Sequence, residues 1–159
     1  MAAEKHVAYP LPLLFTRIVK STEAAKLEYV IGIILSLAVI GFAHTVGFDR
    51  ERAFYPTVLV VTASYYVLFA VIGASSRALI IEIVVATAFL IFALAGFKKS
   101  FWLLAAGFIG HGVFDFVHRF FINNPGVPAW WPGFCLAFDV PIGVFLAARL
   151  TRRSERIST

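Results

Sequence analysis

Three ionisable side chains stand inside an apolar stretch of the chain at a spacing that suits metal binding. His111, Asp115 and His118 occur where nearly all neighbouring residues are aliphatic, aromatic or glycine. On an α-helix these positions lie within about 60° of one another, on a single face. Imidazole and carboxylate groups together suit zinc or non-haem iron. The pattern therefore predicts His111, Asp115 and His118 as ligands of a divalent metal.

Two acidic residues from other apolar stretches complete the candidate site. Asp139 lies inside the following stretch, and Glu82 lies about one helical turn inside an earlier one. We expect Asp139 to act as a fourth metal ligand or as a general base on a metal-bound water, with Glu82 as a second catalytic candidate. A centre with two metal ions would need more ligands, which Glu28 and Glu82 could supply.

The rest of the chain indicates how these residues are positioned. Of its 159 residues, 60% are hydrophobic and only 14% are charged, whereas soluble domains carry about 25% charged residues. The apolar residues form five blocks, each near the length that crosses a hydrocarbon core of about 30 Å. We therefore expect an all-α fold, an integral membrane bundle of five transmembrane helices. The predicted spans are residues 27–48, 53–74, 78–96, 101–122 and 134–150, with a kink at Pro141 in the last.

These blocks divide the chain into three parts. Residues 1–26 form an amino-terminal tail, either a short helix in the membrane interface or a frayed end. Residues 27–150 form the five-helix membrane domain, and residues 151–159 form a basic tail. The apolar run near the start is short and broken by Pro10 and Pro12, so no cleavable signal is expected.

Five spans place the two termini on opposite sides of the membrane. Counting Lys and Arg gives five on the amino-terminal side and eight on the carboxy-terminal side, which favours a cytoplasmic carboxy terminus in a plasma (inner) membrane. His44 then falls in the other half of the bilayer from the candidate site. The ionisable residues that share one leaflet are Glu28, Glu82, His111, Asp115, His118 and Asp139.

Composition also restricts the partners. The net charge of +5 comes from short flanks and loops, so the expected partner is membrane lipid rather than nucleic acid. Cys135 is the sole cysteine, which excludes an intrachain disulfide and a metal site built from cysteines. It is expected to be a packing residue or, because it lies near Asp139, a further ligand candidate. A hydrophobic small-molecule substrate and a homo-oligomer or a larger membrane complex remain compatible with this composition.

Three functions fit these residues. The first is a metal-dependent membrane enzyme, a hydrolase with zinc or an oxidoreductase with non-haem iron, that acts on a lipid-soluble or membrane-adjacent substrate. The second is a non-enzymatic transporter coupled to protons or ions, since Asp, Glu and His inside spans mark such paths. The third is an accessory subunit of a larger complex, with Arg119 pairing with Asp115 or Asp139 and the histidines tying helices together.

Neighbouring residues suggest supporting roles. Gly107, Gly110 and Gly112 are expected to allow close helix packing. Asn124 is expected to cap or turn the chain after the fourth span. The uncharged loop 125–132 lies next to the candidate site and is a candidate lid.

The stretch from His111 onward resembles a family of small multi-span membrane proteins of bacteria and fungi, whose function is unknown. Its signature is His-x-x-x-Asp-x-x-His, then Asn-Pro, further prolines, Phe-Cys and an Asp in the last helix. This chain differs from it in having Arg119 where a second histidine is frequent, and Val140 between Asp139 and Pro141. The matching residues are His111, Asp115, His118, Asn124, Pro125, Pro128, Pro132, Phe134, Cys135 and Asp139. The resemblance implies that these polar residues form the family's signature, and it implies no activity.

Overall fold

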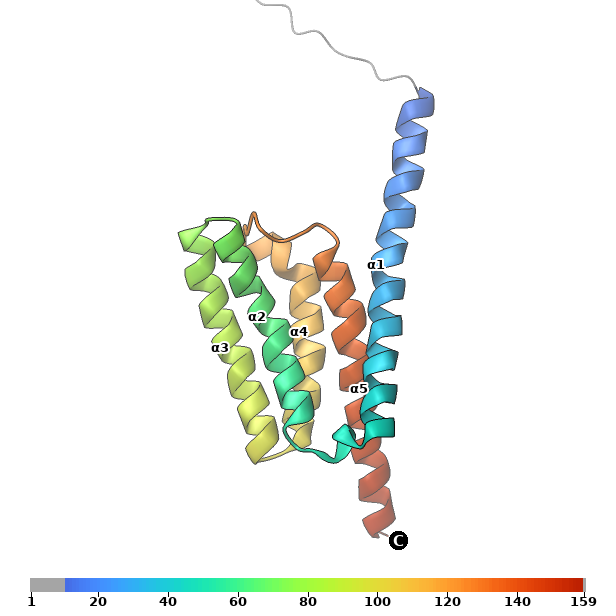
Figure 1. Cartoon of the computed structure of the whole chain (residues 1–159), viewed down its shortest axis with the longest axis vertical. Coiled ribbons are helices and arrows are strands. Elements are labelled where there is room, and N and C mark those ends of the chain that lie inside the picture. The colour runs from blue at the N-terminus through green and yellow to red at the C-terminus, as the bar shows by residue number, and fades with distance from the viewer. Residues whose placement is uncertain (1–10, 159) are drawn as a thin grey trace, which may run out of the picture.

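The part of the chain that the structure describes is mainly helical and contains no strand (Figure 1). This computed structural model describes the backbone of residues 11–158 and the side chains of residues 26–156. The helices are α1 (Leu11–Val46), the short 3-10 helix η1 (Phe48–Arg50), α2 (Phe54–Ile72), α3 (Ser76–Lys98), α4 (Phe101–Phe121) and α5 (Trp131–Ser158). Residues 1–10 of the predicted amino-terminal tail lie outside the described residues.

Each of the five α-helices contains a segment long and apolar enough to cross a membrane. The predicted all-α bundle of five membrane spans is therefore confirmed. The backbone of α1 is helical from Leu11, so the second half of the predicted amino-terminal tail is continuous with the first span. In the same way, α5 continues through Pro141 and through most of the predicted basic tail.

Helices α3 and α4 each begin after a serine that caps the helix. The Ser75 hydroxyl accepts a hydrogen bond from the backbone N–H of Ala78, and the Ser100 hydroxyl accepts one from that of Trp102. Such bonds satisfy N–H groups that the first turn of a helix leaves without a partner. These two caps begin α3 and α4, the helices that carry Glu82 and the two histidines.

Helix α4 lies at the centre of the bundle. It packs against α5 and α3, while α1 packs along α5 and α2 packs against α3 (Figure 1). Its buried face carries Leu104, Phe108, His111, Asp115 and His118 at helical spacing. The peripheral helices α1 and α3 instead expose many aliphatic residues, as expected for surfaces in contact with lipid tails.

Glycines allow the central helices to approach each other closely. A Cβ at Gly143 of α5 would lie 2.9 Å from the carbonyl oxygen of Ala105, and one at Gly112 of α4 would lie 2.9 Å from a Val140 methyl. Gly107 likewise faces Leu59 and Phe92. Gly110 has open space around it, so the expectation of close packing was wrong for that residue.

Candidate metal centre

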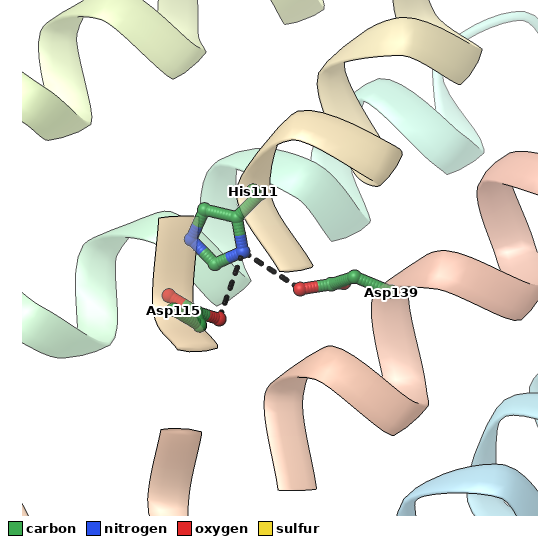
Figure 2. A group of neighbouring side chains, drawn as sticks. All are labelled: His111, Asp115 and Asp139. Atoms are coloured by element: carbon green, nitrogen blue, oxygen red, sulfur yellow. Dashed lines mark hydrogen bonds and ion pairs between the residues drawn. The ribbon is translucent and has the colours of Figure 1, made fainter. Parts of the chain in front are cut away.

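His111 meets the two aspartates in the interior of the bundle (Figure 2). Its Nδ1 lies 2.7 Å from Oδ2 of Asp139 and 3.3 Å from Oδ2 of Asp115. One potential ligand atom from each of the three residues lies within 4.8 Å of the other two. All three side chains are almost completely buried, at 1% exposure or less. These residues form a compact group with one nitrogen and two carboxylate donors.

The helix arrangement explains why the group forms. Asp115 follows His111 by four residues on α4, so both side chains project from the same face. Asp139 comes from α5, which Gly112 and Gly143 allow to lie directly against α4. His111 and Asp139 are 28 residues apart in the sequence, and the close packing of α4 against α5 brings them together.

The carboxylates of the group keep most of their hydrogen-bonding capacity unused. Both oxygens of Asp115 and Oδ1 of Asp139 are buried and have no hydrogen-bond partner. Such groups cost free energy in an apolar interior unless a proton, a water or a cation satisfies them. The donor set and its unsatisfied oxygens therefore fit a divalent cation.

Charge balance points to the same ligand. With His111 as the only base beside two carboxylates, full ionisation leaves a net negative charge in the membrane interior, where unbalanced charge is costly. A divalent cation that replaces the imidazole proton would cancel both carboxylate charges and leave a neutral site. Metal ligands must be deprotonated in this way before they bind.

His118 belongs to a second buried cluster. Its Nε2 lies 2.7 Å from Oε1 of Glu82 on α3, and the same oxygen accepts a hydrogen bond of 3.0 Å from the Asn124 side-chain amide. The Asn124 amide also donates to the backbone carbonyl of Tyr66. The structure thus brings His118 together with Glu82 rather than with His111, Asp115 and Asp139.

Tyr66 of α2 lies between the two clusters. Its ring centroid is 4.3 Å from that of His118 and 6.5 Å from that of His111. Its hydroxyl is buried without a hydrogen-bond partner and lies beside Asp115. The two clusters therefore form one continuous polar interior that spans α2, α3, α4 and α5.

Asn124 is the residue whose position the sequence analysis missed. Asn124 was expected to cap or turn the chain after the fourth span. Its side-chain oxygen Oδ1 does accept a hydrogen bond from the backbone N–H of Gly126. Its amide, however, joins the loop after α4 to Glu82. The available signal was the Asn-Pro pair directly after a helix that carries two histidines.

Other ionisable residues lie apart from this interior. Glu28 is packed against Gly133 in the first turn of α5. The Arg119 guanidinium is exposed and lies over the Phe120 ring, 5.0 Å from its centroid, so the expected pairing of Arg119 with an aspartate was wrong. His44 contacts Asp49 beyond the end of α1, away from the two clusters.

A groove leads from the perimeter of the bundle toward the metal-binding group. It has a volume of about 1000 Å³ and lies between α1, α2 and α5. Its walls are mainly apolar, with Ile31, Leu35 and Phe138 among them. Cys135 lines the groove and also lies beside Asp115 and Asp139, so the groove reaches a residue next to the metal-binding group.

The fold and the site together define an integral membrane bundle with a buried His/Asp/Asp group. No family model, curated protein or solved structure matches the chain.

Proposed function

We propose that this protein is a metal-dependent membrane enzyme that acts on a lipid-soluble substrate. The observation that carries the proposal is the group formed by His111, Asp115 and Asp139, in which buried carboxylate oxygens lack partners. Ionisable residues placed inside membrane spans usually serve a function, because burying them costs free energy.

The proposed ligands are His111, Asp115 and Asp139, and the bound ion would be zinc or iron. Such an ion supplies Lewis acidity to a bound substrate oxygen. Asp139 has one oxygen against His111 and one without a partner, so it is suited to accept a proton from the reacting group. His118, held by Glu82, would position Tyr66 and the loop after α4.

The groove between α1, α2 and α5 supports a lipid-soluble substrate. α1 packs along α5 and α2 along α3 and α4, so the space between α1 and α2 faces the surrounding bilayer. Its volume lies within the range of small-molecule sites, about 300–1000 Å³. A hydrophobic molecule could enter sideways from the membrane and approach the carboxylates past Cys135.

The experiment compares lipid turnover by the wild type and by Asp139→Asn, which keeps the shape of the side chain. Each protein, supplied with zinc or with ferrous iron and air in a nanodisc, is incubated with a total membrane lipid extract. Mass spectrometry should find one lipid class consumed and a product formed by the wild type alone. Asp49→Asn serves as the control, because it makes the same chemical change in a residue that contacts His44 and Arg149 and leaves the three ligands and the groove intact; it should retain turnover.

Equal lipid profiles for the wild type and Asp139→Asn, with metal demonstrably bound to the wild type, would contradict the enzymatic proposal. A metal-loaded protein without turnover would instead support a structural metal in an accessory subunit.

A further inference from the structure

A second cavity lies between the loop joining α1 to α2 and the carboxy-terminal half of α5. At this end of the bundle α5 extends beyond the other helices (Figure 1). The cavity has a volume of about 350 Å³ and is bordered by the loop between α1 and α2, the first turns of α2 and α4, and the last turns of the span in α5. The basic side chains that line it are Arg50, Arg52, Arg149 and Arg153. This concentration of guanidinium groups around one cavity favours an anionic ligand.

Two of these arginines already have partners. Arg149 pairs with Asp49 at 2.7 Å, and Arg52 donates a hydrogen bond to the carbonyl of Phe97 and lies over the Phe101 ring. For the side chains of Arg50 and Arg153, the described residues provide neither a hydrogen bond nor an ion pair. Asp49 is the one acidic residue among the lining side chains described, and it is shared by Arg149 and His44. The cavity therefore keeps an excess of positive charge.

Tyr55 provides an independent observation at the same place. It lines the cavity, its side chain is 1% exposed, and its hydroxyl is buried without a hydrogen-bond partner. A buried hydroxyl of this kind is normally satisfied by a protein group or by a bound molecule. A neutral donor beside several guanidinium groups suits recognition of an oxyanion with more than two acceptor oxygens.

We propose that this cavity binds a phosphate group through Arg50, Arg153 and the Tyr55 hydroxyl. Arginine matches phosphate because its planar fork donates two parallel hydrogen bonds. The phosphate could come from the headgroup of an anionic lipid or from a free phosphate in solution. Basic pockets between membrane helices bind such headgroups, and the site is separate from the metal-binding group and independent of its function.

The test measures binding of two probes to the purified full-length protein in neutral detergent, read as a saturable shift of the thermal unfolding midpoint. The probes are dihexanoyl phosphatidic acid and inorganic phosphate, each against chloride at equal ionic strength. Arg153→Gln should weaken binding of the effective probe about tenfold, and Tyr55→Phe should weaken it severalfold. A response to the lipid alone assigns a headgroup site, and a response to both shows that free phosphate is accepted.

Arg152→Gln is the matched control, because Arg152 is the exposed neighbour of Arg153 on α5 and does not line the cavity. It removes the same charge and should leave affinity within about twofold of the wild type. If Arg152→Gln and Arg153→Gln lowered the affinity for the probe equally, binding would depend on general surface charge, and the proposal would be overturned. The absence of a saturable shift with both probes would also overturn it.

Discussion

The Nδ1 atom of His111 on α4 lies 2.7 Å from Oδ2 of Asp139 on α5 (Figure 2). This contact fixes the orientation of the imidazole and places its nitrogen between two carboxylates, since Asp115 lies on the other side at 3.3 Å. The arrangement differs from an ordinary interhelical cross-link, in which a single pair of groups satisfies each other. Here one base faces two acids, and the surplus of carboxylate oxygens is what suggests a cation.

The two histidines of α4 should respond differently to mutation. His111→Gln should lose bound metal, because it removes the nitrogen ligand. His118→Gln should retain most of the metal but lower stability by about 1–3 kcal/mol, because it removes the imidazole that contacts the buried Glu82 side chain at 2.7 Å. Metal content and the free energy of unfolding, measured on the same preparations, check both statements.

Glu82→Gln is the companion variant for this prediction. It keeps the shape of the side chain that contacts His118 and Asn124, and metal content should again match the wild type. Loss of metal from both His118→Gln and Glu82→Gln, with the fold intact, would instead assign His118 to the metal centre.

Close packing of α4 and α5 should depend on Gly143. Gly143→Ala would bring a Cβ to 2.9 Å from the Ala105 carbonyl oxygen, and overpacking of this kind costs about 1–3 kcal/mol. Gly110→Ala, on the open side of α4, should be neutral or stabilise by up to about 1 kcal/mol, since alanine is the better helix former. Thermal unfolding of the two variants in one detergent measures the difference, and equal midpoints would refute the packing argument.

The ion pair at the end of α1 should give a pH-dependent contribution to stability. Burial raises the pKa of Asp49, but hydrogen bonds and charges from His44 and Arg149 outweigh it and hold that pKa below its ordinary value. A lowered pKa in the folded state means that ionised Asp49 stabilises the fold above about pH 4 and that this contribution is lost as the pH falls further.

The corresponding variant is Asp49→Asn. At pH 7 it should be less stable than the wild type by about 1 kcal/mol, because Asp49 is 4% exposed but its partner Arg149 is 46% exposed, so that solvent screens the charge of the arginine. The two proteins should converge in stability as the pH is lowered below about 4. A difference that is unchanged or larger at acidic pH would contradict the assigned ion pair.

Much of the fold could be predicted because lipid imposes simple requirements on sequence. A span needs an uninterrupted apolar stretch, and Ser75 and Ser100 mark where two spans begin. The inward direction of His111 and Asp115 followed from helical spacing, since charged groups avoid lipid. These inferences depend on one helix at a time, which is why the sequence alone could support them.

Pairings between helices could not be predicted in the same way. Whether His118 meets Asp139 or Glu82 depends on the rotation of α3 about its axis and on the path of the loop after α4. Neither is encoded by periodicity, because every side of α3 is largely apolar and Glu82 is its one acidic residue. The hydrogen bond from Asn124 to Glu82 could not be predicted for the same reason, because it depends on the rotation of α3 and on the path of the loop after α4.

Metal analysis of the purified full-length protein tests the central claim most directly. Purification without chelators, followed by inductively coupled plasma mass spectrometry, should find about one zinc or iron ion per chain in the wild type. Asp139→Asn should lose that ion, while Cys135→Ala should keep it. A folded wild type that carries no divalent metal, and that binds neither zinc nor ferrous iron when these are supplied, would contradict the account.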